Sequence, residues 1–129
     1  RLYYIMSLRS EQVHVAPFTA ADLEGAIAAG KPVLIDFWAE WCGPCRMLKP
    51  ELAKAAAILK DEVDVRACNV DEEQQLAGMF QVQGIPNMSL LVGSNVIAAI
   101  VGFRPADQIV ADVRAALAAY KAKQAEATN

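Results

Sequence analysis

The sequence predicts a single α/β domain in which strands and helices alternate and an antiparallel hairpin follows. Three observations support this prediction. Residues 33–38 form an almost continuously apolar run, apolar residues recur at helical spacing from Cys42 onward, and two strand-like runs at 88–92 and 96–101 are joined by three residues. A chain of 129 residues is close to the usual size of one domain, so we expect one core.

The first part of the chain contains a strand, a helix and a second strand. Residues 12–15 alternate polar and apolar side chains, as a short edge strand does. Thr19 is a suitable N-cap with Asp22 three residues later, which predicts a short helix ending at Gly30. The run 33–38 is rich in β-forming residues, and we expect a central strand buried on both faces.

The remaining elements follow from similar patterns. The helix after Cys42 is indicated by Leu48, Leu52, Ala55 and Leu59. Residues 63–70 predict a second parallel strand, with a helix around Leu76 after it, and residues 84–86 interrupt the alternation before the hairpin. A C-terminal helix is indicated by the apolar stripe of Ile109, Val110, Val113, Leu117 and Tyr120. We expect it to end in a polar tail at 121–129.

Composition excludes several classes of function. The formal net charge of -3 argues against binding to nucleic acid or to an anionic membrane, because both require a basic surface. No apolar run approaches the roughly 18 residues that span a bilayer, and the run 2–6 is shorter than the roughly 7 residues of a signal-peptide core. We therefore expect a soluble protein that is not exported.

Two cysteines, Cys42 and Cys45, lie where the strand 33–38 gives way to a helix, and three uses are possible for them. A zinc site needs four ligands, and the chain offers only Cys68 and His14 besides this pair, so no metal site is predicted. A structural disulfide around a two-residue loop removes little chain entropy. A redox dithiol is favoured, because unpaired N–H groups at the helix start stabilise a thiolate on Cys42.

The third cysteine, Cys68, indicates whether the protein works in a reducing or an oxidising compartment. An odd number of cysteines fits a secreted disulfide framework poorly, since one thiol is left over. Cys68 lies in a predicted strand, where we expect a small buried hydrophobic residue. These observations favour a reducing compartment, and we expect the protein to be cytoplasmic.

Neighbours of the pair have distinct physical properties. Pro44 fixes its own φ at a helix start and lacks the N–H that would be unpaired there, whereas Gly43 lets a partner chain come close. Asp36 interrupts the apolar run. It is either buried, with a pKa raised by desolvation and able to exchange protons near neutral pH, or exposed at an edge of the strand. The residues alone leave both alternatives open.

The residues 36–45, Asp-Phe-Trp-Ala-Glu-Trp-Cys-Gly-Pro-Cys, resemble the active-site signature of the thioredoxin family. Residues 84–86, Gly-Ile-Pro, resemble a conserved turn of that family, and residues 69–71 and 101–102 match further positions. The resemblance extends from about Val13 to about Ala119. It implies the thioredoxin fold, a central mixed β-sheet flanked by helices on both faces.

The expected organisation has three parts. The thioredoxin domain would occupy residues 11–120, with the polar tail 121–129 after it. Residues 1–10 are expected to be an N-terminal extension, partly introduced by cloning or processing, because the chain starts at Arg1 and Met6 is a candidate initiator.

The resemblance implies a protein-disulfide reductase that exchanges a dithiol for a disulfide. Cys42 would attack a substrate disulfide, and Cys45 would then resolve the mixed disulfide. Asp36 would be the buried acid that handles the proton of Cys45, and Pro86 would be the cis-proline beside the pair. The backbone at Ile85 would pair with an extended substrate segment.

Further expectations concern partners. The implied docking surface consists of Trp41, Gly43, Pro44, Ile85, Pro86, Val101 and Gly102. A flavin-containing, NADPH-dependent thioredoxin reductase would recycle the disulfide, and the clients would be proteins with disulfides. We expect a monomer without a cofactor of its own, acting in electron transport and in cell redox homeostasis.

Three positions depart from the family pattern. Ala67 stands where many members carry a lysine near the buried acid, Asn87 follows the proline where threonine is usual, and Phe103 is bulkier than usual. Two alternative functions are compatible with the same residues. One is a thiol oxidase or disulfide isomerase in an oxidising compartment, and the other is a binding subunit that uses the docking surface without turnover.

Overall fold

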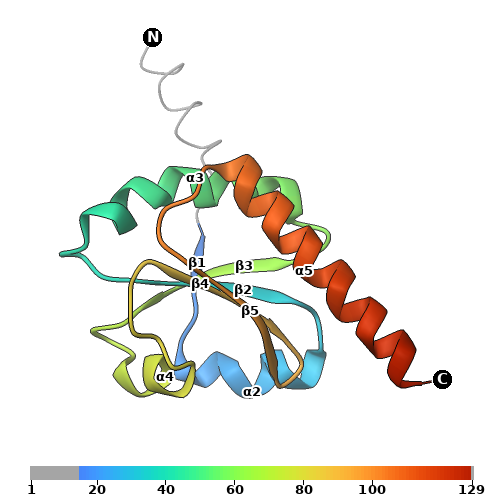
Figure 1. Cartoon of the computed structure of the whole chain (residues 1–129). Coiled ribbons are helices and arrows are strands. Elements are labelled where there is room, and N and C mark those ends of the chain that lie inside the picture. Colours follow the sequence, from blue (N-terminus) through green and yellow to red (C-terminus); the bar gives the residue numbers. More distant parts are fainter. Residues whose placement is uncertain (1–14, 129) are drawn as a thin grey trace, which may run out of the picture.

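A five-stranded sheet lies between two layers of helices in the computed structural model, which describes residues 15–128 (Figure 1). The strands are β1 (Ala16–Pro17), β2 (Val33–Trp38), β3 (Asp64–Asn69), β4 (Asn87–Val92) and β5 (Asn95–Val101). The helices are α2 (Ala20–Ala29), α3 (Gly43–Leu59), α4 (Gln74–Met79) and α5 (Ala106–Ala127). The predicted α/β fold with a mixed central sheet is confirmed.

The strand order is β1-β3-β2-β4-β5, so β2 is central. It pairs in parallel with β3 and antiparallel with β4. Asp36, in the middle of β2, is therefore opposite Ala67 on one side and Met88 on the other. The predicted hairpin is also present, because β4 and β5 pair antiparallel.

Helices α3 and α5 cover one face of the sheet, and α2 and α4 cover the other (Figure 1). Successive side chains of a strand point to opposite faces. Leu34 accordingly packs with Leu48 of α3 and Ile109 of α5, whereas Phe37 packs with Leu76 of α4. Asp36, two residues from Leu34, projects toward the α3 side.

Helix α2 begins and ends where the sequence predicts. Thr19 is the N-cap and forms a capping box with Asp22, whose Oδ2 accepts the backbone N–H of Thr19 at 2.8 Å. Gly30 is the C-cap with a φ of +73°, a left-handed conformation that glycine adopts without strain.

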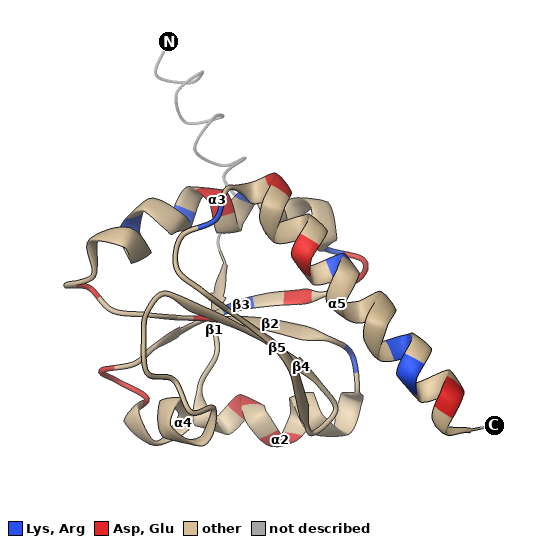
Figure 2. Ribbon diagram, viewed as in Figure 1, with Lys and Arg blue, Asp and Glu red and all other residues tan. Residues whose placement is uncertain are grey.

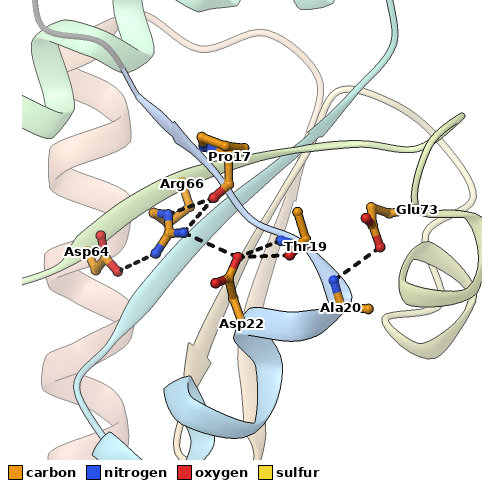
Figure 3. Close-up of polar contacts among 7 residues, drawn as sticks. All are labelled: Pro17, Thr19, Ala20, Asp22, Asp64, Arg66 and Glu73. Carbon is orange, nitrogen blue, oxygen red and sulfur yellow. Dashed lines mark hydrogen bonds and ion pairs between the residues drawn. The ribbon is translucent and has the colours of Figure 1, made fainter.

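Arg66 of β3 ties this helix and the edge strand to the sheet (Figure 3). Its Nε donates to the carbonyl oxygen of Pro17 at 3.0 Å, its Nη2 donates to Asp22 Oδ2 at 3.3 Å, and its Nη1 donates to Asp64 Oδ2 at 3.3 Å. The guanidinium side chain is 22% exposed. One side chain thus holds β1, the start of α2 and β3 together.

Helix α5 is longer than expected. The predicted polar tail at 121–129 was wrong as a description of residues 121–127, because the helix continues to Ala127 (Figure 1). These residues are exposed, but lysine, alanine, glutamine and glutamate all have high helix propensity. The polar side chains of these residues show that the helix no longer packs against the core, but the helix itself continues.

The expected edge strand at 12–15 lies mostly outside the described residues, and the strand that pairs with β3 is Ala16–Pro17. Charged residues are found mainly on the helices and loops, while the strands carry few (Figure 2). Between residues 15 and 128 no helix has both the length and the apolar character needed to cross a membrane.

Candidate active site

The two cysteines lie at the junction between β2 and α3, and they form a disulfide with a Cα–Cα distance of 5.2 Å. Cys42 is the N-cap of α3, and the backbone N–H of Cys45 donates to its Sγ at 3.2 Å. Pro44 occupies the first turn, as its missing N–H permits. The sulfur of Cys42 therefore sits where unpaired N–H groups favour negative charge.

Accessibility distinguishes the two sulfur-bearing residues. Cys42 is 5% exposed and Cys45 is fully buried. An incoming group can reach the pair only from the Cys42 side, so this asymmetry suits a disulfide with one outward and one inward cysteine.

The turn at residues 84–86 packs against the disulfide. The peptide bond between Ile85 and Pro86 is cis, and the carbonyl oxygen of Ile85 lies 3.9 Å from Cys42 Sγ. The N–H of Gly102 donates to the carbonyl oxygen of Pro86 at 2.8 Å. The fold thus brings together segments around residues 42, 85 and 102 that are far apart in the sequence.

Exposed apolar groups surround this disulfide. Trp41 is 68% exposed and Val101 is 53% exposed, and Gly43 and Pro44 are exposed as well. We call Trp41, Gly43, Pro44, Ile85, Val101 and Gly102 the apolar surface around the disulfide. Trp41 Nε1 donates to Asp71 Oδ2 at 2.9 Å, which restrains the indole at one end of this surface. Asp71 belongs to the segment 69–71 that matches the family, but no role was predicted for it.

Asp36 is buried, with 1% of its surface exposed, so the alternative of an exposed strand residue was wrong. Burial raises the pKa of this carboxyl to about 7, and the positive charge of Lys49 acts in the opposite direction. Within the described part of the chain, Asp36 Oδ1 has no hydrogen-bond partner. This carboxyl can gain or lose a proton near neutral pH.

A pocket of about 240 Å³ lies beside Asp36, between α3 and the strands β2 and β3. Its lining consists of Val15, Asp36, Trp38, Lys49, Leu52, Ala53 and Ala67. Lys49 is exposed, and its Nζ lies 4.0 Å from the centroid of the Trp38 ring. Lys49 was not among the residues predicted for the site, although its position four residues after Cys45, on the helix face that also bears Leu52, was a usable signal.

Four further residues singled out in the sequence are Cys68, Asn87, Phe103 and His14. Cys68 is a buried free cysteine, as predicted, and burial raises the pKa of its thiol to about 12. Asn87 is 5% exposed and its Oδ1 accepts a hydrogen bond from Ser89 Oγ at 2.8 Å, while Phe103 is 38% exposed. His14 lies outside the described residues. Among residues 15–128 no three or more His, Cys, Asp or Glu residues are grouped so that they could hold a metal ion.

Comparison with known proteins gives a consistent result. The family model described as thioredoxin matches residues 14–115. The thioredoxin of Alicyclobacillus acidocaldarius is 40% identical over 95 residues, which are 74% of this chain and 90% of that protein. Thioredoxin 1 of Chlorobaculum tepidum is 42% identical over 86 residues, covering 67% of this chain and 85% of that protein.

A solved structure agrees with these relatives. Chloroplastic thioredoxin z superposes with a TM-score of 0.69 at 34% identity, covering 82% of this chain and 96% of the other. The disulfide at the start of α3, the adjoining cis-proline turn and these matches lead to one conclusion. The chain belongs to the thioredoxin family of thiol–disulfide oxidoreductases.

Proposed function

We propose that the chain reduces disulfides in client proteins, with Cys42 as the nucleophile and Cys45 as the resolving thiol. The observation that carries this proposal is the asymmetry of the disulfide. Cys42, at a helix N-terminus, keeps 5% of its surface exposed, whereas Cys45, in the first turn of the helix, is fully buried.

The exchange balances without a further reagent. The thiolate of Cys42 attacks one sulfur of a client disulfide, whose S–S bond breaks and whose other sulfur leaves as a thiolate. The thiolate of Cys45 then attacks Cys42 Sγ, the bond between Cys42 and the client breaks, and the second client sulfur leaves as a thiolate. The two client thiolates take up two protons, equal in number to those that Cys42 and Cys45 have lost. Two electrons pass to the client, and the chain is left with the disulfide that the structure contains.

Asp36 is proposed to accept the proton that the Cys45 thiol loses in the second step. Two observations support this role: the carboxyl is buried on the α3 side of the sheet, and its pKa of about 7 allows proton exchange at physiological pH. The pocket beside it provides room for the proton to reach solvent.

The client is proposed to dock on the apolar surface around the disulfide, next to the cis-proline Pro86. Exposed apolar groups there would contact the client side chains, while the backbone at Ile85 would pair with an extended client segment. This geometry favours an extended loop or an unfolded segment as the substrate.

The proposed electron donor is an NADPH-dependent thioredoxin reductase. A relative in Mycobacterium leprae, 38% identical over 67% of this chain and covering only 19% of that protein, is called a bifunctional thioredoxin reductase/thioredoxin. We further propose a monomer that acts in the cytoplasm, in electron transport and redox homeostasis. The buried free thiol of Cys68 is compatible with a reducing compartment.

Insulin reduction tests the proposal. With NADPH and thioredoxin reductase the wild-type chain should reduce insulin, Cys42→Ser should abolish turnover, and Cys68→Ala should retain it. Full turnover by Cys42→Ser would refute the mechanism. A potential well above the roughly -270 mV of thioredoxin would favour an oxidase or isomerase instead. If a variant that lacks both Cys42 and Cys45 kept full activity in an assembly assay, a binding subunit would be favoured.

A further inference from the structure

The pocket beside Asp36 carries a feature that the proposed function does not use. Lys49 of α3 lies at its rim with Nζ against the ring of Trp38, while Asp36 and Ala67 line the same pocket from β2 and β3. Ala67 lies directly opposite Asp36 in the pairing of β2 with β3, and its side chain is an uncharged methyl group. The positive charge at this pocket is therefore that of Lys49 on α3.

The contact with Trp38 keeps the ammonium group close to the pocket. A lysine side chain on a helix surface otherwise samples many rotamers, but an aromatic ring attracts the cation to its face. Asp36 has an oxygen without a hydrogen-bond partner among the described residues, so the nearby positive charge is the interaction that favours its ionised form.

We propose that Lys49 is an electrostatic positioning residue for Asp36, supplying from α3 the positive charge that Ala67 leaves out of β3. The role rests on the proposed function, because the charge state of Asp36 matters to catalysis only if Asp36 takes the proton of Cys45. A protonated carboxylic acid cannot accept that proton. Lys49 therefore increases the fraction of molecules that can complete the second exchange at neutral pH.

The neighbours of Asp36 on the packed elements include two cysteines and a methionine. Cys45 of α3 is in the disulfide and does not titrate until the pair is reduced. Cys68 of β3 packs in the cluster on the opposite face of the sheet, although Asp36 contributes to its raised pKa. Met88, the β4 partner of Asp36, has no charge. Lys49 is thus the group whose removal should change the titration of Asp36.

Carbon-13 NMR of the Asp36 carboxyl in the oxidised protein measures the effect without turnover. Lys49→Met should raise the pKa of Asp36 by roughly half a pH unit or more, because an opposite charge stabilises the carboxylate. Lys49→Arg should leave it close to the wild-type value. Lys54→Met, which removes a lysine of the same helix that does not line the pocket, is the matched control.

A kinetic measurement connects this titration to the reaction. In single-turnover release of a preformed mixed disulfide, the midpoint of the pH profile should move upward by the same amount in Lys49→Met. The rate at pH 7 should fall about twofold for half a pH unit, because the ionised fraction of a carboxyl with a pKa of about 7 falls from about one half to about one quarter. Adding Ala67→Lys to Lys49→Met should restore the midpoint, since the new cation would enter the pocket from β3.

The outcomes separate the two proposals. If Lys49→Met and the second variant Lys49→Gln titrate as Lys54→Met does, the role of Lys49 is refuted. If the pKa of Asp36 changes in Lys49→Met but the midpoint of the pH profile of the rate does not, Lys49 does not act in catalysis. The proposal that Asp36 accepts the proton of Cys45 is then refuted as well. An absence of insulin reduction by the wild type would refute the reductase alone, because the NMR titration would still decide whether Lys49 acts on Asp36.

Discussion

The backbone N–H of Cys45 donates to Cys42 Sγ at 3.2 Å, so the first turn of α3 would stabilise negative charge on Cys42 once the disulfide is reduced. The same turn places Cys45 in the core. One helix start therefore gives the two residues different chemistry, although they are only three positions apart in the sequence.

This asymmetry predicts which single variant traps a client. Cys45→Ser should accumulate a mixed disulfide on Cys42, because the accessible nucleophile remains and the resolving thiol is gone. Cys42→Ser should trap almost nothing, since Cys45 is inaccessible. Non-reducing mass spectrometry after incubation with oxidised insulin measures the adduct, with Cys68→Ala as control. An equal yield from both variants would contradict the assigned order.

Asp36→Asn should stabilise the protein above neutral pH. The pKa rises from an ordinary 3.8 to about 7 on folding, so the folded state binds more protons between these values and wild-type stability falls as pH rises from about 4 to 7. A difference of about three pH units corresponds to roughly 4 kcal/mol. The amide cannot ionise and avoids this cost.

Urea unfolding at pH 5 and pH 8 tests this expectation. Asp36→Asn should gain about 2–4 kcal/mol relative to wild type at pH 8 and much less at pH 5. The exposed residue Asp61 supplies the control Asp61→Asn, which should show no such difference. Equal effects of Asp36→Asn at the two pH values would mean that packing, and not charge, is responsible.

Asp71→Ala should weaken the docking of a client protein more than it slows disulfide exchange. It removes the acceptor for Trp41 Nε1, so the exposed indole loses its restraint at the apolar surface. We expect KM for insulin to rise roughly 2- to 10-fold with a smaller change in kcat. Greater indole mobility in fluorescence anisotropy should accompany it. Glu72→Ala is the neighbouring control, and a pure loss of kcat would argue against a docking role.

Arg66→Met should reduce stability without changing catalysis. Arg66 holds β1, the start of α2 and β3 together through hydrogen bonds to Pro17, Asp22 and Asp64, and none of these residues belongs to the apolar surface around the disulfide (Figure 3). We expect a loss of about 1–2 kcal/mol in urea unfolding, because several partly exposed bonds are lost at once. Lys121→Met serves as control. A large drop in kcat at full folding would contradict this structural role.

Local patterns were sufficient for most elements of this protein. The apolar run at Val33–Trp38, the capping residues Thr19 and Gly30, and the cysteine pair at a strand-to-helix junction were all predicted. Each depends on residues within one or two turns of one another, so the sequence carries the signal directly. The predicted end of α5 was wrong, because polar residues after Tyr120 do not stop a helix. Their high helix propensity lets α5 continue to Ala127.

The environment of Asp36 was decided by tertiary structure. The residues of the run 33–38 predicted a central strand but left open whether Asp36 is buried within it or exposed at its edge, and only the family resemblance implied a buried acid. Pairing of β2 with both β3 and β4, with α3 packed above, removes Asp36 from water and raises its pKa to about 7.

Long-range contacts likewise complete the site. The sequence alone predicted the cysteine pair, its spacing and its place at a helix start. The family resemblance implied that the turn at Ile85 and Pro86 lies beside the pair, and the structure places the carbonyl oxygen of Ile85 3.9 Å from Cys42 Sγ. The position of Lys49 at the Asp36 pocket came only with the fold. Burial and electrostatic coupling depend on distances between side chains that separate elements bring together, and a local pattern does not contain those distances.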